Sequence, residues 1–345
     1  MTIRYSIIIP VYNRPDELNE LLDSLLALKN RGSDLKKDPS AAQADWEVIV
    51  VEDGSALRSE DVCKEYSSAL DVTYLYQENA GPAAARNTGS RSARGEWLIF
   101  FDSDCIIPEG YFDAVNTALK DESIDFFGGP DRAAAEFTDT QKAIDYAMTS
   151  FLTTGGIRGG RRKLDRYYPR SFNKGVRKSA FEEVGGFSGL RFGEDLDLSM
   201  RLMEAGYSSA LIEEAWVYHK RRTDLKKFFK QVYNSGMARV VLNRLHPGTM
   251  KLVHLLPSIF VLYLLAALVS LLFSPGVMWY PVGILAVVLF IDGFRSTGSI
   301  GASLLVPPAG FVQLCGYGSG LIHAVILIHV LGRNSASAFE ETFYK

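Results

Sequence analysis

Two carboxylates one residue apart, Asp102 and Asp104, follow directly on a run of five apolar residues, Trp97 to Phe101. Such a run is typical of a strand that is buried on both faces of a parallel sheet. Ligands of parallel sheets collect just beyond the carboxyl ends of the strands. Two carboxylates at that place suit a hard divalent cation, which takes oxygen ligands and shares them with substrate phosphates. On this segment alone, an acidic turn that closes a strand is the alternative.

Similar polar clusters follow three earlier strand candidates. The strand candidates are Tyr5 to Pro10, Trp46 to Val51 and Val72 to Tyr76. The clusters that follow them are Val11-Tyr12-Asn13, Glu52-Asp53-Gly54-Ser55 and Gln77-Glu78-Asn79-Ala80-Gly81. Helical patterns lie between the strands, and the segment Pro15 to Leu28, for example, places four leucines on one face. Strands that alternate with helices predict an α/β fold with a mainly parallel sheet, in which right-handed crossovers bring all four clusters to one edge.

Two further candidates lie far along the chain. Glu194 and Asp195 begin a helical pattern, where acidic residues either do chemistry or simply stabilise the first turn. His219 ends an apolar-aromatic run and precedes three basic residues. A lone histidine is often structural, so the residues alone leave a ligand role and a structural role open.

The composition narrows the class of protein. A chain of 345 residues has room for a sizeable core and an appended region, and its net charge of −3 gives no sign of a nucleic-acid partner. The three cysteines, Cys63, Cys105 and Cys315, are too far apart for a zinc motif and fit a reducing compartment. The first apolar run is too short for a signal peptide, and it runs straight into Pro10.

The last third of the chain is strongly apolar. Leu252 to Ser274 is long enough to cross a bilayer, and Gly276 to Ile291 is a second, slightly shorter run. A third run, Ile300 to Leu331, is interrupted by two prolines and three glycines. For this third run the sequence leaves three possibilities open, which are a single span, a broken hairpin and a helix that lies in the membrane interface. A buried helix of a soluble protein is the alternative for each run.

A basic helical pattern precedes these runs. Between Asp224 and Leu245 the apolar residues follow helical spacing, and basic residues occupy other positions, namely Lys226, Lys227, Lys230, Arg239 and Arg244. A basic amphipathic helix next to a spanning segment is typical of the cytoplasmic membrane surface, although a helix packed on the catalytic core is the alternative. The positive flank predicts that the first 250 residues face the cytosol.

Taken together, the strand-end motifs resemble those of the family 2 glycosyltransferases, which have the GT-A fold, a Rossmann-like and mainly parallel sheet. The resemblance covers roughly residues 3 to 245. The motifs that carry it are Ile8-Ile9-Pro10-Val11-Tyr12-Asn13, Val50-Val51-Glu52-Asp53-Gly54-Ser55, Asn79-Ala80-Gly81-Pro82-Ala83-Ala84-Ala85-Arg86-Asn87, Asp102-Ser103-Asp104, Asn173-Lys174-Gly175 to Glu183-Val184-Gly185-Gly186-Phe187, and Gly193-Glu194-Asp195-Leu196-Asp197-Leu198. The chain looks most like bacterial enzymes that carry a hydrophobic C-terminal tail and build surface polysaccharides.

The resemblance implies a catalytic domain over residues 1–222. The charge and hydropathy patterns predict a basic interfacial helix over 223–250, membrane-associated helices over 251–331 and a tail over 332–345. The resemblance implies that a sugar passes, with inversion, from a nucleotide diphosphate, usually UDP, to an acceptor hydroxyl. Such a displacement needs a positioned donor, a neutralised diphosphate and a base for the hydroxyl proton. The expected cofactor is Mg²⁺ or Mn²⁺, and its expected ligands are Asp102, Asp104 and His219, with Asp104 the direct ligand.

The resemblance also assigns roles around the donor and the acceptor. The donor-binding set is Pro10, Tyr12, Glu52, Asp53, Asn79, Arg86, Asp102 and Ser103. Within it, Asp53 would hydrogen-bond the base, and Glu52 stands where an aspartate is more usual. Asp195 is the expected catalytic base, with Glu194 beside it on the acceptor side.

A membrane-bound cytosolic site predicts a saccharide or lipid-linked acceptor at the bacterial inner membrane and no nucleic-acid partner. Two alternatives remain at this point. A nucleotidyltransferase shares the architecture, but it would need a glycine-rich basic loop after the first strand, where this chain has Val11 to Pro15. The other alternative is a scaffold protein that has the fold and has lost the activity.

Overall fold

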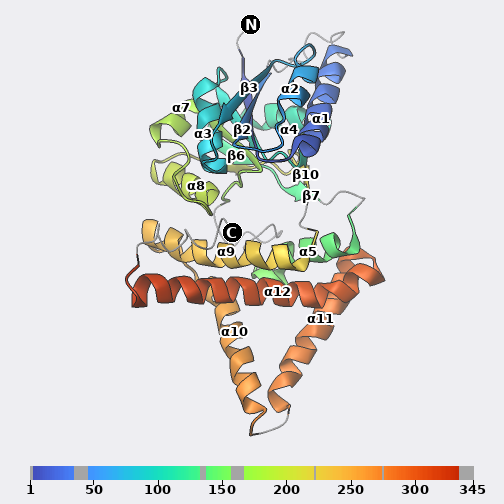
Figure 1. The fold of residues 1–345 in the computed structure, drawn as a ribbon, viewed down its shortest axis with the longest axis vertical. Helices are drawn as coiled ribbons and strands as arrows, with labels where there is room; N and C mark the ends of the chain where they lie inside the picture. The colour runs from blue at the N-terminus through green and yellow to red at the C-terminus, as the bar shows by residue number, and fades with distance from the viewer. Residues whose placement is uncertain are drawn as a thin grey trace. The chain divides into compact units, whose positions relative to one another are not determined.

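The computed structural model describes residues 3–34, 46–132, 137–156, 167–220, 223–273 and 276–333. The chain divides into two compact units (Figure 1). The first unit comprises residues 1–132 and 166–220, and the second comprises residues 133–165 and 221–345. Residues 133–165 therefore belong with the C-terminal helices, whereas the sequence grouped them with the catalytic domain. The expected tail lies almost wholly outside the described residues.

A seven-stranded mixed sheet forms the centre of the first unit. Its strand order is β3-β2-β1-β4-β8-β6-β9, and all neighbouring pairs are parallel except the two that β8 makes with β4 and β6. The strands are β1 (Tyr5–Val11), β2 (Trp46–Asp53), β3 (Val72–Gln77), β4 (Trp97–Phe101), β6 (Phe126–Gly128), β8 (Asn173–Arg177) and β9 (Ser209–Leu211). The predicted α/β fold with a mainly parallel sheet is confirmed.

Helices cover both faces of this sheet. They are α1 (Pro15–Asp34), α2 (Glu60–Tyr66), α3 (Pro82–Ser92), α4 (Tyr111–Ala118), α7 (Lys178–Glu183) and α8 (Glu194–Glu204). Alternate residues of β1 point to opposite faces, so Ile7 and Ile9 pack with the leucines of α1 while Ile8 packs with α3, α7 and α8. All five residues of β4 are at most 2% exposed, as the apolar run predicted.

A second, three-stranded sheet lies beyond the end of β4. It consists of β5 (Cys105–Ile106), β7 (Asp131–Arg132) and β10 (Val217–His219), in the order β5-β10-β7. Because His219 is paired with Cys105 in the antiparallel β5–β10 ladder, a residue near the end of the unit comes next to the acidic pair after β4.

The second unit is entirely helical in its described residues. Its elements are α5 (Asp139–Thr149), α6 (Phe151–Thr154), α9 (Leu225–Leu245), α10 (Leu252–Ser270), η2 (Val277–Trp279), α11 (Tyr280–Thr297), α12 (Ile300–Val325) and η3 (Ile326–Val330). A core joins α5, α9, α11 and α12 through side chains such as Ile144, Phe228, Leu289 and Val306. Within this unit α9 and α12 run side by side, and α10 and α11 extend away from α12 as a hairpin (Figure 1).

Three segments of the second unit are long and apolar enough to cross a membrane. They are Leu252–Ser270, Val277–Thr297 and Ile300–Val330. The third run is a continuous helix rather than a broken hairpin, because α12 passes through Pro307 and Pro308 without interruption.

Candidate active site

The polar clusters after the strands meet at one edge of the large sheet, as predicted. Asn13, which follows β1, joins the loops after β1 and β2. Its side-chain oxygen accepts hydrogen bonds from the backbone N–H groups of Ala56 at 2.8 Å and Leu57 at 2.9 Å. Its own N–H donates to the Ser55 hydroxyl at 2.7 Å. Asn13 adopts a left-handed backbone conformation with a φ of 53°, which asparagine tolerates better than most residues.

Asp53 holds the turn that leads into α3. One carboxylate oxygen accepts hydrogen bonds from the Gln77 side chain at 2.7 Å and the Ala80 N–H at 2.9 Å. The other oxygen accepts from the Gly81 N–H at 2.8 Å, and the Asn79 side chain donates to the Asp53 backbone carbonyl at 2.9 Å. The side chains of Asp53 and Asn79 therefore shape this edge of the sheet, and their contact with a nucleotide base stays a prediction.

Glu52 is buried beneath the same edge. It accepts hydrogen bonds from the Ser59 N–H at 2.7 Å and from the Ser55 hydroxyl, so it fixes the loop after β2. Tyr12, in contrast, is 53% exposed at the edge, and Pro10 is half-buried. Of these predicted donor-binding residues, Tyr12 has the most surface available for a ligand.

Arg86 connects the two acidic motifs of the first unit. It lies on α3 and is 3% exposed. Its guanidinium donates to Asp102 at 2.6 Å and to Glu194 at 3.2 Å. A buried guanidinium with two carboxylate partners is held in place firmly, because each bond is charge-assisted. The sequence analysis placed Arg86 near the sugar and phosphates of the donor, and the structure adds that it links the end of β4 to the start of α8.

Asp104 faces a cation on each side. One carboxylate oxygen forms an ion pair with Arg14, and the other lies 3.1 Å from Nε2 of His219. Burial opposes ionisation of Asp104, but the His219 and Arg14 partners outweigh it and hold the pKa of Asp104 well below its usual range. Burial also opposes the charged form of His219, but Asp104 and Asp131 outweigh it and raise the pKa of His219 to about 9.

The side chains at this corner fit a divalent cation. Ligand atoms of Asp104, Cys105 and His219 lie within 4.8 Å of one another, and Nε2 of His219 is 3.9 Å from an Asp102 oxygen. Burial raises the pKa of the Cys105 thiol well above its usual value. The structure thus brings together the three residues predicted as metal ligands, Asp102, Asp104 and His219. Ser103, between the two aspartates, is 5% exposed.

Glu194 and Asp195 begin α8, as predicted, and Asp195 is surrounded by cations. Lys174, from β8, is fully buried and donates from Nζ to the Asp195 backbone carbonyl at 2.7 Å and to the Ser199 hydroxyl at 2.9 Å. One Asp195 carboxylate oxygen lies 3.4 Å from Arg170, and the other accepts from the Leu196 N–H at 2.8 Å. Burial lowers the pKa of Lys174 to about 7.

The environments of Glu194 and Asp195 push their pKa values apart. Burial, reinforced by the neighbouring Asp195 charge, raises the pKa of Glu194 to about 7. Burial acts on Asp195 in the same direction, but Arg170 and Lys174 outweigh it, so the pKa of Asp195 lies below its ordinary value. Two adjacent carboxyl groups that differ in this way are typical of acid–base sites.

Three residues at this site received no role from the sequence: Arg14, Arg170 and Lys174. Lys174 carried a usable signal, because a lysine in the middle of a short buried strand needs a polar partner inside the protein. Arg14 and Arg170 lie in loops, and their partners are 90 and 25 residues away in the chain. No local pattern marks such pairs.

Comparisons with known proteins agree with the motifs. The family model for glycosyl transferase family 2 matches residues 6–185, and that for glycosyl transferase family group 2 matches residues 97–291. An uncharacterized glycosyltransferase of Haemophilus influenzae is 29% identical over 232 residues, which cover 64% of this chain and 70% of that protein. Glycosyltransferase AglE of Haloferax volcanii is 26% identical over 231 residues, which cover 65% of this chain and 70% of that protein.

One solved structure supports the fold. It is the mannosyltransferase PcManGT from Pyrobaculum calidifontis in complex with GDP-Man and Mn²⁺. The TM-score is 0.62 at 15% sequence identity, and the match covers 90% of this chain and 87% of that one. At this identity the likeness establishes a GT-A-like fold, in agreement with the sheet described above.

Proposed function

Because the chain belongs to glycosyltransferase family 2, an inverting family that uses nucleotide sugars, we propose that it moves a sugar from UDP to a membrane-associated acceptor. We propose a lipid-linked or other saccharide acceptor in the synthesis of a bacterial surface glycan. The observation that carries this proposal is the convergence of the acidic pair after β4, His219 and the start of α8 through one buried arginine, Arg86.

On the donor side, the loops after β1, β2 and β3 would hold the nucleotide. The 53% exposure of Tyr12 leaves its ring available to stack on the base, and the Asp53 carboxylate would reach the base at the same edge. Asp102, Asp104 and His219 would hold Mg²⁺ or Mn²⁺, which supplies positive charge to the leaving diphosphate. The resemblance to a GDP-Man and Mn²⁺ complex supports a nucleotide-diphosphate sugar and a divalent cation.

On the acceptor side, Asp195 would take the hydroxyl proton. The acceptor oxygen forms a bond to the anomeric carbon while the bond from that carbon to the diphosphate breaks, and the proton passes to the Asp195 carboxylate. Arg170 and Lys174 keep Asp195 ionised and therefore ready to accept a proton. Glu194, which hydrogen-bonds Arg86, would keep the guanidinium oriented between the two halves of the site.

Two features support a location at the cytoplasmic face of the bacterial inner membrane. The second unit contains three segments long and apolar enough to span a membrane. Three lysines at the start of α9, Lys226, Lys227 and Lys230, are exposed. Exposed lysines beside apolar helices suit the anionic surface of a cytoplasmic leaflet.

The test uses the full chain in membrane vesicles. UDP-sugars and GDP-sugars are offered one at a time with Mn²⁺ and a lipid extract of bacterial membranes, and product mass is recorded. Transfer from a UDP-sugar that stops after chelation of the metal supports the proposal. Transfer from GDP-sugars alone contradicts the assigned nucleotide. No transfer from any donor, together with normal UDP binding, supports the alternative of an inactive scaffold.

A further inference from the structure

The three candidate membrane segments are not equivalent in the structure. The rest of the chain covers 50% of the most apolar window in Ile300–Val330, but only 17% of that in Leu252–Ser270 and 11% of that in Val277–Thr297. Figure 1 shows the reason, because α12 lies lengthwise beside α9 while α10 and α11 extend from it as a hairpin. Apolarity alone does not distinguish these helices, but their packing does.

The hairpin carries an exposed apolar surface, and the charged residues of α11, Asp292 and Arg295, lie in its last two turns. From Leu255 to Ile291 the sequence contains no Asp, Glu, Lys or Arg. Large side chains along α10 are more than half exposed, for example Leu256 at 56% and Ile259 at 58%. Near the tip, Leu272 is 79% exposed and Phe273 is 84% exposed. A continuous apolar surface of this kind is typical of contact with lipid.

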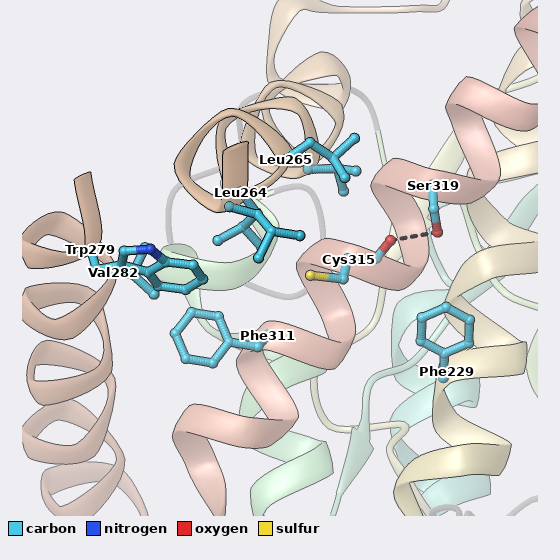
Figure 2. A pocket seen from close by; sticks show the side chains of 10 residues that line it. Phe229, Leu264, Leu265, Trp279, Val282, Phe311, Cys315 and Ser319 are labelled. Atoms are coloured by element: carbon cyan, nitrogen blue, oxygen red, sulfur yellow. Dashed lines mark hydrogen bonds between the residues drawn. The ribbon is translucent and has the colours of Figure 1, made fainter. Parts of the chain in front are cut away.

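Between the legs of the hairpin lies an open groove of about 590 Å³ (Figure 2). Its lining is apolar and comes from α9, α10, η2, α11 and α12, for example Phe229, Leu264, Trp279, Val282 and Phe311. The Ser319 hydroxyl donates to the Cys315 backbone carbonyl at 2.6 Å, so it presents no free donor to the groove. Hydrocarbon chains of membrane lipids suit such a groove, whereas water does not.

Helix α12, in contrast, is locked against α9 by glycines. A Cβ atom at Gly320 would lie 2.0 Å from the Tyr233 carbonyl oxygen. One at Gly236 of α9 would lie 2.1 Å from the Tyr317 carbonyl oxygen. Small residues that let two helix backbones approach this closely fix the helices in one register. The Tyr233 hydroxyl also hydrogen-bonds Nδ1 of His323.

The contact with α9 limits how deeply α12 can lie in a membrane. The exposed lysines of α9 keep that helix out of the hydrocarbon layer, because a charge at the centre of a bilayer is costly. Since α12 runs side by side with α9 and touches its backbone, this would place α12 along the same interface rather than across the bilayer.

We propose that α10 and α11 cross the membrane as a two-helix hairpin. Helices α9 and α12 lie flat in the membrane interface, on the face of the membrane where α10 begins and α11 ends. The 19 residues of α10 and 18 residues of α11 have the lengths required. The tip of the hairpin reaches the far headgroup layer, where Trp279 and Tyr280 suit the aromatic belt. Thr223, which precedes α9, and Arg333, which follows η3, then lie on one side of the membrane. That this side is the cytosol rests on the proposed function.

The test measures which side of the membrane reaches three single cysteines, introduced as Thr223→Cys, Val277→Cys and Arg333→Cys in a Cys315→Ala background. The remaining native cysteines, Cys63 and Cys105, are buried. A membrane-impermeable maleimide is added to bacterial spheroplasts and to inverted vesicles. We expect Val277→Cys to react only in spheroplasts, and Thr223→Cys and Arg333→Cys only in inverted vesicles.

Three outcomes would overturn the proposal. Labelling of Arg333→Cys from the side opposite to Thr223→Cys indicates three spans. Labelling of Val277→Cys from the same side as Thr223→Cys, or only after detergent is added, indicates a hairpin that does not cross. Glycosyltransfer by the same vesicles is measured in parallel, so a wrong topology and a wrong function give different results.

Discussion

Around the candidate active site of the first unit buried charges lie next to one another, whereas along the α9–α12 contact of the second unit glycines let two helix backbones approach. Around the candidate active site, Arg86, Lys174 and Asp195 are each at most 9% exposed, and each has a charged or hydrogen-bonding partner within 3.4 Å. Along the α9–α12 contact, Gly236 and Gly320 bring backbone against backbone instead.

The difference shows that different interactions fix the side chains of the active site and the helices of the second unit. Buried ion pairs fix the directions of side chains, which a catalytic site needs, and removing one partner leaves an uncompensated charge. A glycine contact fixes the distance and register of helices, which a membrane-bound unit needs, and adding one side chain disrupts it. Substitutions in the two units should therefore change activity and stability in different ways.

The largest effect is expected for Asp195→Asn. The amide cannot take up the acceptor proton, so kcat should fall by at least about 100-fold, while the similar shape leaves the fold intact. The measurement is the rate of transfer at saturating donor, with Tm as the check on folding. Glu194→Gln is the matched control, since it keeps the Asp195 carboxylate. A larger loss in Glu194→Gln than in Asp195→Asn would reassign the base to Glu194.

Arg86→Met should damage both stability and activity. The substitution leaves Asp102 and Glu194 without their shared cation, and loss of one partner in a buried pair costs about 3–5 kcal/mol. A fall in Tm of roughly 10 °C for the detergent-solubilised chain would correspond to this cost. Arg91→Met on the same helix is the control, because Arg91 is exposed. Equal Tm values for the two variants would show that the Arg86 bridge does not stabilise the unit.

Gly320→Leu should disrupt the second unit while leaving the chemistry of the first in place. The new side chain would meet the Tyr233 carbonyl, and overpacking of this kind costs about 1–3 kcal/mol. Gly283→Leu on α11 is the matched control, since a Cβ there meets nothing within 4 Å. Thermal unfolding in detergent measures the difference. If Gly320→Leu and Gly283→Leu have the same Tm, the close contact between α9 and α12 does not contribute to stability.

The last expected effect is a pH dependence of stability that comes from Lys174. Its pKa is about 7 in the folded chain and 10.5 as the ordinary value, so the unfolded chain binds more protons between these limits. The contribution of Lys174 to stability is complete above pH 10.5 and is lost as the pH falls toward 7, with a slope of up to about 1.4 kcal/mol per pH unit.

The Tm difference between the native chain and Lys174→Met should therefore increase in favour of the native chain from pH 7 to pH 9. Lys178→Met, which changes a partly exposed lysine of α7, serves as the control. A pH-independent difference would mean that Lys174 stays charged in the folded protein.

Much of the first unit was predictable from its local patterns. The apolar runs predicted the four parallel strands. The polar residues after these strands predicted the sheet edge at which Asp53, Asp102 and Asp104 lie. The approach of His219 to Asp104 was an expectation from family resemblance, because its physical cause, the pairing of β10 with β5, is a two-residue ladder between distant segments. The Arg14 partner of Asp104 left no sequence signal at all.

The second unit was harder to predict, because hydropathy measures composition and not packing. Ile300 to Leu331 had the composition of a span, and the sequence left its placement open. Gly316 and Gly320 interrupt the apolar run in the sequence, whereas in the structure they are contact points within one continuous helix. The transfer of residues 133–165 to this unit depends on contacts with helices more than 100 residues away, which no window of sequence contains.

That long-range transfer also affects how the protein is made. During translation α5 is synthesised early. Asp292, the hydrogen-bond partner of Tyr146, is synthesised 146 residues later, so this hydrogen bond forms late. At typical rates of synthesis this delay is on the order of 10 to 30 s. During that time the apolar face of α5, with Ala143, Ile144 and Ala147, has no native partner from α11 or α12. Phe228 and Val232 of α9, which belong to the same core, are synthesised before α11 and α12.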